Sequence, residues 1–306
     1  MEKKQSLWRS AVRSMRLRTL PLSLAGVCLG ILLAAADYHV SVWVALLTML
    51  TTVCLQILSN LSNELGDVLH GTDTGERIGP QYGLNSGEMG VADMKNLIRL
   101  FVVLCIASGL GMIRVSFGTL FSLESLCLML LGASAIMGAM KYTLGRNPYG
   151  YRGLGDIFVF LFFGLVAVLG AYFVAAHAIP SWILLLPAST MGFFSVGVLN
   201  VNNIRDMSTD AQTRVTVALK LGLRGARIYQ TILIVLGWAC MFTYCGLRFF
   251  DPWHYLFVLT LPLYIKHLQG VWTLQDRALD KMLPLLVLSS FAFSLLAGLG
   301  FVKFLF

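Results

Sequence analysis

Two polar stretches of this chain, motif 1 at residues 60–73 and motif 2 at residues 202–210, each close a long apolar run. Acidic side chains beside apolar segments are costly unless a cation or a polar partner compensates their charge. The two stretches are therefore candidate functional sites. The amide and acidic residues that we single out are Asn63, Asp67, Asp73, Asn202, Asn203, Asp206 and Asp210.

The spacing within both motifs is helical. Residues four positions apart share one face of an α-helix, so Asn63 and Asp67 are predicted to line one face of the first helix. The same rule places Asn202, Asp206 and Asp210 on one face of the second helix and its extension. Asn63 to Asn202 and Asp67 to Asp206 are each 139 positions apart. This offset predicts two pseudo-equivalent helix groups around one cavity, within a single domain that covers residues 1–306.

Asp73 lies past Gly71 and off the helical face, so we expect it to come from a loop that folds back over the helix end. Several carboxylates around one cavity would repel one another unless cations are bound. Oxygen ligands without a nearby Cys or His favour Mg²⁺, which combines one or two carboxylates with water and phosphate oxygens. The predicted arrangement is two metal-binding arms that face a diphosphate, formed by Asp67, Asp73, Asp206 and Asp210.

The composition places the chain in a lipid bilayer. It is 57% hydrophobic and only 12% charged, whereas soluble domains average about 25% charged residues. Repeated apolar stretches are long enough to cross a hydrocarbon core of about 30 Å. The net charge of +8 comes without a basic run interleaved with aromatic residues, so we do not expect nucleic acid as a partner. The six scattered cysteines predict neither a disulfide framework nor a zinc site.

The apolar windows predict an all-α, polytopic membrane protein with about nine transmembrane helices around a central cavity. Helices are expected because lipid offers no partner for the unpaired backbone groups of an open sheet. The predicted spans lie near residues 19–37, 41–63, 96–114, 118–140, 155–177, 181–203, 225–247, 253–272 and 283–303.

The basic residues indicate the orientation of these spans. Nineteen of the 23 Lys and Arg residues fall on the face that holds the N-terminus and the loops after even-numbered spans. Cytoplasmic loops carry such an excess. We therefore expect an integral protein of the cytoplasmic (inner) membrane, with its N-terminus in the cytoplasm and its C-terminus on the opposite side. Both motifs, and the opening of the cavity, would then face the cytoplasm.

The loop after the fourth predicted span adds glycines, tyrosines and cations. Its candidate site residues are Lys141, Tyr142, Arg146, Tyr149 and Arg152. The cations could reach phosphate oxygens, and the tyrosine rings could face a developing carbocation. Tyr and Arg are also common anchors at a membrane interface, which is the alternative for this loop. Arg77 follows motif 1 directly and is a better phosphate candidate, with a solvated loop charge as its alternative.

A cation-coupled transporter is the alternative function of another class, because such proteins also use intramembrane carboxylates. Their ion sites usually lie near the bilayer midplane, in broken helices. Motifs 1 and 2 are instead predicted at helix ends beside basic loops. This placement favours a site for a metal and a diphosphate.

In combination, these features resemble the UbiA superfamily of intramembrane aromatic prenyltransferases. The resemblance rests on the nine spans and on the patterns Asn63-x₃-Asp67-x₅-Asp73 and Asn202-x₃-Asp206-x₃-Asp210. Three segments are similar to the menaquinone branch of that superfamily. They are Asp73-Thr-Gly-Glu-Arg77-Ile-Gly-Pro80, Tyr149-Gly-Tyr-Arg-Gly-Leu-Gly-Asp156 and Asn202-Asn-Ile-Arg-Asp206.

The resemblance implies Mg²⁺-dependent transfer of a polyprenyl group from polyprenyl diphosphate to 1,4-dihydroxy-2-naphthoate, with loss of CO₂, to give demethylmenaquinone. It implies that Asn63 and Asn202 orient or ligate the metal, and that Arg77, with Lys141 or Arg146, stabilises the diphosphate. A sibling enzyme that prenylates 4-hydroxybenzoate or homogentisate is the alternative.

The chain departs from the pattern of the family at three places. Glu64 stands where the family usually has Asp, and Asp156 stands where Glu is common. Residues 212–216 replace the usual Gly-Lys-Arg-Thr and contain one basic residue fewer.

Overall fold

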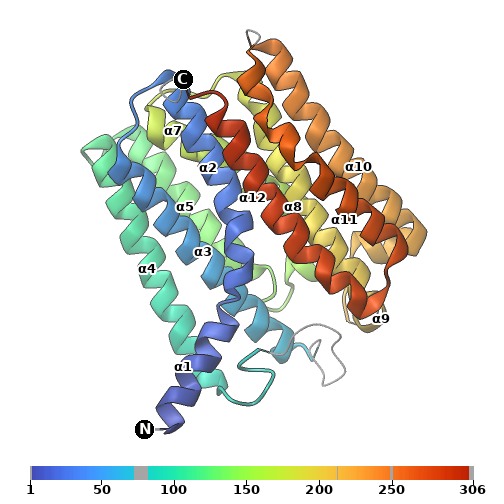
Figure 1. Ribbon diagram of the computed structural model, residues 1–306. Helices are drawn as coiled ribbons and strands as arrows, with labels where there is room; N and C mark the ends of the chain where they lie inside the picture. The colour runs from blue at the N-terminus through green and yellow to red at the C-terminus, as the bar shows by residue number, and fades with distance from the viewer. Residues whose placement is uncertain (1, 72–81, 212, 249–250, 303–306) are drawn as a thin grey trace.

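The computed structural model describes residues 2–71, 82–211, 213–248 and 251–302. Within these residues the chain is almost entirely helical and contains no β-strand, which confirms the all-α membrane fold. The long helices run side by side as a bundle, with α1 at one end and the last turn of α12 at the other (Figure 1). The described residues of both motifs lie at the end that carries α1.

The α-helices are α1 (Glu2–Ser14), α2 (Leu20–Asp37), α3 (Val42–Leu69), α4 (Val91–Phe117), α5 (Leu123–Lys141), α6 (Gly155–Val159), α7 (Ala171–Ala176), α8 (Leu185–Arg205), α9 (Met207–Asp210), α10 (Val217–Leu247), α11 (Leu261–Thr273) and α12 (Met282–Leu299). Between α6 and α7 the chain is π-helical over η3 (Phe160–Gly170), so the three form one continuous span. The 3₁₀ segments are η1 (Leu17–Thr19), η2 (Tyr149–Tyr151), η4 (Trp182–Leu184), η5 (Pro252–Thr260) and η6 (Asp276–Lys281).

Eight helical segments of the described chain are long and apolar enough to cross a membrane. They correspond to eight of the nine predicted spans. The remaining prediction, at residues 253–272, is covered by the consecutive helical segments η5 and α11, but this stretch is not among the eight. The pseudo-equivalence of two helix groups stays a prediction.

Capping residues and one glycine account for several helix boundaries. The hydroxyl of Ser122 accepts a hydrogen bond from the Ser125 amide at the start of α5, and Thr216 does the same for Leu219 at the start of α10. Gly222 interrupts α10 with φ 67°, a left-handed value that glycine adopts without strain. The predicted span at 225–247 therefore begins just after this break.

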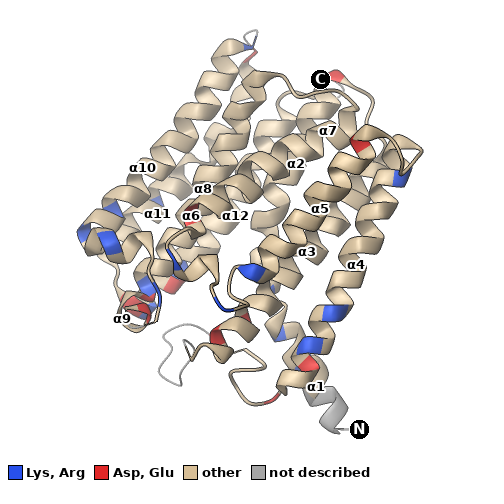
Figure 2. Ribbon diagram, turned by 180° about the vertical axis from the view of Figure 1, so that it is seen from behind, with Lys and Arg blue, Asp and Glu red and all other residues tan. Residues whose placement is uncertain are grey.

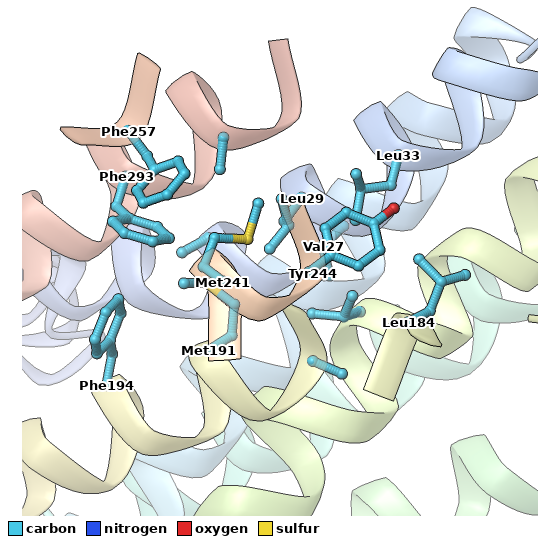
Figure 3. Close-up of a cluster of buried hydrophobic side chains, with 14 of the residues drawn as sticks. Val27, Leu29, Leu33, Leu184, Met191, Phe194, Met241, Tyr244, Phe257 and Phe293 are labelled. Atoms are coloured by element: carbon cyan, nitrogen blue, oxygen red, sulfur yellow. The ribbon is translucent and has the colours of Figure 1, made fainter. Parts of the chain in front are cut away.

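The main apolar core lies where α2, α7, α8, α10 and α12 meet. The ring of Phe194 lies 4.8 Å from that of Tyr264 and 5.1 Å from that of Phe293, measured between centroids. Figure 3 shows Phe194, Phe293 and Met241 directed into the same space. Burial and aromatic packing thus fix α8, the helix of motif 2, against its neighbours.

Helix α2 packs closely along η3 because two of its residues have no side chain. A Cβ on Gly26 would lie 2.7 Å from the Phe163 carbonyl oxygen, and one on Gly30 would lie 2.3 Å from the Val168 carbonyl oxygen. This close approach positions Phe163, which faces the cavities described below.

Charged residues are concentrated at the end of the bundle that carries α1 and α9 (Figure 2). Long stretches of the helices above that end are free of charge, as a lipid environment requires. The polar chemistry of the described chain is therefore gathered at the end where α3 and α8 finish.

We predict that Gly30→Ala destabilises the protein by about 1–3 kcal/mol, because the new methyl group would overlap the Val168 carbonyl and force α2 away from η3. Thermal unfolding in detergent measures the effect. Gly111→Ala in α4 is the matched control, since no atom lies within 4 Å of the added Cβ, and it should be neutral or slightly stabilising. Equal losses at both positions would contradict the close packing of α2 on η3.

Candidate active site

A polar cavity of about 220 Å³ opens where the two motifs meet. Motif 1 contributes Asn63 and Asp67, and motif 2 contributes Asn202, Asn203 and Asp206. The helical spacing of each motif thus directs its polar residues into a common space. Four arginines also line this cavity, namely Arg16, Arg18, Arg205 and Arg214.

Motif 1 reaches the cavity because α3 is 28 residues long, about 42 Å at 1.5 Å per residue, and so extends beyond a hydrocarbon core. Gly66 lets the segment after α5 touch this extension, since a Cβ there would lie 2.4 Å from Oγ1 of Thr143. The Thr143 hydroxyl donates to the Ser62 carbonyl at 2.9 Å. This contact places the neighbouring Tyr142 beside Asn63 in the cavity wall.

A second set of contacts joins motif 1 to the end of motif 2. The Tyr151 hydroxyl donates to Oδ1 of Asp67 at 2.7 Å, and Arg214 pairs with Asp210 at 3.0 Å. The Arg214 guanidinium also lies 5.5 Å from the centre of the Tyr151 ring. The backbone amide of Val215 donates to the Tyr151 carbonyl at 3.0 Å, so the two loops that carry these side chains are bonded directly.

Electrostatic compensation dominates at Arg214. Burial alone would lower the pKa of this guanidinium, but the carboxylates of Asp67 and Asp210 outweigh burial and raise its pKa. Arg214 therefore stays charged between the two motifs.

Arg205 organises the cavity side of motif 2. Its side chain is 1% exposed and donates from Nε and Nη2 to the two carboxylate oxygens of Asp206, at 2.8 and 2.7 Å. Nη2 also donates to Oδ1 of Asn202 at 2.8 Å, and Nη1 donates to Oδ1 of Asp280 at 2.6 Å. One buried cation thus holds Asn202 and Asp206 of motif 2 and joins them to Asp280 of η6.

The turn between α1 and α2 forms another wall. Arg16 has φ 50°, and its guanidinium carbon lies 4.0 Å from the centre of the Tyr82 ring. Arg18 donates to the Tyr82 hydroxyl at 3.0 Å and lies 3.8 Å from Asp280. Two cations and an aromatic ring from distant parts of the chain therefore meet at this wall.

An apolar cavity of about 350 Å³ continues from the polar one. Both cavities are lined by Gln56, Asn63, Tyr142, Val159, Phe163 and Leu199. Residues of α3, α5 and η3 make up most of its wall. Tyr149 contributes as well, stacked on Phe158 with ring centroids 4.0 Å apart, and its hydroxyl donates to the Gly138 carbonyl.

Tyr142 lies at the junction of the two cavities. Burial raises the pKa of its phenol to about 12, so the group remains a neutral donor. A Cβ on Gly150 would lie 2.7 Å from the Tyr142 carbonyl oxygen, and one on Gly155 would lie 3.1 Å from its hydroxyl oxygen. The glycines of this loop therefore make room for the ring at the junction.

The structure brings together part of the predicted site. Asn63, Asp67, Asn202, Asn203 and Asp206 line the polar cavity, Tyr142 lines both cavities, and Tyr149 lines the apolar one. Asp210 is buried against Arg214 and lines neither cavity. Three exposed cations also line neither, namely Lys141, Arg146 and Arg152. Asp73 and Arg77 lie outside the described residues.

The predicted site omitted Tyr82 and Tyr151, together with the four arginines of the polar cavity. In the sequence, Arg16 and Arg18 are topology signals only, since a basic residue before a first span looks like any other positive-inside charge. Arg205 lies within motif 2, and its charge beside Asp206 was the one available signal. Tyr82 has no such signal in the sequence, because it reaches the cavity only through its tertiary contacts with Arg16 and Arg18.

The donor set of the polar cavity suits Mg²⁺. Within the described ranges no group of three or more His, Cys, Asp or Glu side chains could hold a metal. Mg²⁺ does not need such a group, because it binds through one or two carboxylates together with water and substrate phosphates. Asp67 and Asp206, with the amide oxygens of Asn63 and Asn202, fit that requirement. The metal roles predicted for Asp73 and Asp210 stay predictions.

Comparison with known proteins identifies relatives over nearly the whole chain. The UbiA prenyltransferase family model matches residues 23–299. The 1,4-dihydroxy-2-naphthoate octaprenyltransferase of Escherichia coli (strain K12) is 37% identical over 98% of this chain and 97% of its own length. The Haemophilus influenzae protein of the same name is 38% identical, over 97% of each chain.

Solved structures with low sequence identity share the fold. A UbiA homolog from Aeropyrum pernix K1 superposes with a TM-score of 0.65 at 15% identity, covering 98% of this chain and 99% of that chain. A UbiA homolog from Archaeoglobus fulgidus bound to GPP and Mg²⁺ gives a TM-score of 0.60 at 15% identity, covering 97% and 99%.

We predict that Arg205→Met destabilises the protein by about 3 kcal/mol, because it leaves the buried Asp206 carboxylate without its cation and leaves Asp280 with only the more distant Arg18. This loss of stability is at the lower end of the range expected when one partner of a buried ion pair is removed, because the Asp280 side chain is 34% exposed. Thermal unfolding in detergent measures the loss. The exposed Arg152 offers the control Arg152→Met, which should change stability by less than about 0.5 kcal/mol. An equally small effect of Arg205→Met would contradict its organising role.

Proposed function

The chain belongs to the UbiA prenyltransferase family, and on that basis we propose that it transfers a polyprenyl group from polyprenyl diphosphate to 1,4-dihydroxy-2-naphthoate, in menaquinone biosynthesis. The observation that carries this proposal is the pair of adjoining cavities, one polar and lined by both motifs, the other apolar and lined by α3, α5 and η3. A substrate with a charged head and a long apolar tail matches this pair.

The polar cavity would hold the diphosphate. Asp67 and Asp206, supported by the oxygens of Asn63 and Asn202, would hold Mg²⁺, whose charge stabilises the diphosphate as it leaves. Arg205 and Tyr151 keep these carboxylates in place through the hydrogen bonds described above. Each carboxylate oxygen can accept a further ligand besides those bonds.

The apolar cavity would hold the first part of the prenyl chain. Tyr142 and Phe163 line both cavities and Tyr149 lines the apolar one. An aromatic face turned toward the allylic carbon would stabilise the positive charge that develops there. The same side chains exclude water, which would otherwise capture that carbon.

The reaction balances without an added oxidant or reductant. The bond between the prenyl carbon and the diphosphate oxygen breaks, and the diphosphate keeps the electron pair. Ring carbon 2 of the naphthoate then bonds to the allylic carbon. The electrons of its bond to the carboxylate return to the ring as CO₂ leaves, which gives the prenylated hydroquinone. Conversion of that hydroquinone to the quinone is a separate two-electron oxidation that is not part of this step.

The position of the motifs suits a cytoplasmic face of the inner membrane. The end of the bundle that carries α1 also holds most of the described charges (Figure 2), as expected for the cytoplasmic side under the positive-inside rule. We propose that the N-terminus lies on that side and the C-terminus on the other. Water-soluble diphosphate would then be released to the cytoplasm while the product stays in lipid.

We predict that Asp67→Asn and Asp206→Asn each reduce Mg²⁺-dependent prenylation of 1,4-dihydroxy-2-naphthoate at least about a hundredfold, because each removes a carboxylate that would hold Mg²⁺, the cation that offsets the charge of the diphosphate. Product formation in purified membranes, read by mass, measures this. Asp37→Asn, at an ion pair with Arg248 outside both cavities, should keep wild-type activity. Full activity in either motif variant would refute the assignment of the metal site.

The second prediction concerns the tail. Ala135→Phe would fill part of the apolar cavity and should lower kcat/KM for a long-chain prenyl diphosphate about tenfold, with a smaller loss for geranyl diphosphate. Ala133 is exposed on the same helix and lines neither cavity, so Ala133→Phe is the control. Equal losses with both chain lengths, or in both variants, would argue against a tail in this cavity.

A further inference from the structure

One cation of the polar cavity differs from the other three. Arg205 and Arg214 are each ion-paired with aspartates, and Arg18 lies near Asp280. Arg16 has no ion pair within the part of the chain that the structure describes. Its Nε and Nη2 atoms are shielded from water and have no hydrogen-bond partner there. Unused guanidinium donors beside a cavity are costly unless an anion occupies that cavity.

The fold holds Arg16 in this position against a local preference. A residue other than glycine rarely adopts φ 50°, and such strain persists where neighbouring contacts fix it. Here Asn60 of motif 1 is 4% exposed and donates from Nδ2 to the Met15 carbonyl and to the Thr19 hydroxyl, both at 2.9 Å. The Thr19 hydroxyl donates to the Arg16 carbonyl at 2.9 Å. The turn around Arg16 is thereby tied to the helix that carries motif 1.

Tyr82 fixes the guanidinium itself. The guanidinium carbon of Arg16 lies over the Tyr82 ring, 4.0 Å from its centre, and the Tyr82 hydroxyl accepts a hydrogen bond from Arg18. A guanidinium over an aromatic ring is still a planar, two-pronged donor along its edge. Helix α12 contacts η1 beside this turn and contributes three apolar residues to the cavity, namely Leu283, Pro284 and Val287.

We propose that Arg16 binds the carboxylate of the aromatic acceptor, with Tyr82 and Arg18 as its support and the α12 residues against the acceptor ring. This inference rests on the proposed function. A planar guanidinium matches a carboxylate through two parallel hydrogen bonds, and a flat apolar wall matches a naphthalene ring. The contact binds and orients the acceptor before the ring attacks.

The diphosphate is the other oxyanion that could meet Arg16. It would already be compensated by Mg²⁺ at Asp67 and Asp206 and by Arg214 between the motifs. Arg16 instead enters from the turn before α2, whose neighbour is the apolar wall of α12. The acceptor needs both a cation and an apolar surface, and this part of the cavity supplies them together.

The test separates the two substrates. In Arg16→Gln, KM for 1,4-dihydroxy-2-naphthoate should rise about tenfold or more, while KM for the prenyl diphosphate should stay within about twofold of wild type. Arg16→Lys keeps the charge but loses the planar fork, so it should show a smaller rise in KM for the acceptor. Arg9→Gln, at an exposed arginine outside both cavities, should leave both values unchanged. A rise in KM for the diphosphate alone, or no rise in either, overturns the proposal.

A binding measurement keeps the proposal testable apart from the reaction. Calorimetry without prenyl diphosphate should show that wild-type protein binds 1-hydroxy-2-naphthoate more tightly than 1-naphthol, which lacks the carboxylate. Arg16→Gln, or Arg16→Lys if the first variant does not fold, should reduce this preference. If wild type makes no prenylated naphthoate but the preference depends on Arg16, the proposed function fails and the carboxylate site stands. No preference in wild type refutes the site.

Discussion

Compensation of buried carboxylates is the constraint on which the arrangement of this molecule depends. Acidic groups at the ends of membrane helices are stable only when cations or hydrogen-bond donors reach them. Asp206 is held by Arg205, and Asp67 receives the hydroxyl of Tyr151. Asp210 is paired with Arg214. Each of these contacts also fixes a backbone segment. The contacts that compensate the charges therefore also determine the shape of the cavity.

Hydrogen bonds across the fold also join parts of the site that are distant in the sequence. The loop after α5 and the loop before α10 are bonded through Tyr151 and Val215, between motif 1 and motif 2. The turn at Arg16 is bonded to Asn60. Apolar packing alone would align the helices without specifying these loops, because it is not directional. Directional hydrogen bonds are what bring the polar side chains to one place, beside a cavity that η3 and α5 keep apolar.

The sequence predicted the fold class and the helical spans well, because long apolar windows allow few alternatives in lipid. The helical spacing of Asn63 and Asp67 likewise placed both on the face that lines the cavity. Other parts needed the structure. Hydropathy could not show that the span near 253–272 changes from a 3₁₀-helix to an α-helix at Leu261. Nor could composition show which arginines enter the cavity, because Arg16 and the exposed Arg146 look alike in sequence and differ only in tertiary contacts.

We propose that motifs 1 and 2 form one metal-dependent site, and that this site prenylates a naphthoate that carries a carboxylate. The most direct measurement incubates purified protein with prenyl diphosphates and a panel of aromatic acceptors, with and without Mg²⁺, and reads the products by mass. We expect a product only with Mg²⁺ and 1,4-dihydroxy-2-naphthoate, at the mass of the prenylated ring without its carboxylate. Product formation without Mg²⁺, or from 4-hydroxybenzoate or homogentisate in place of the naphthoate, would contradict it.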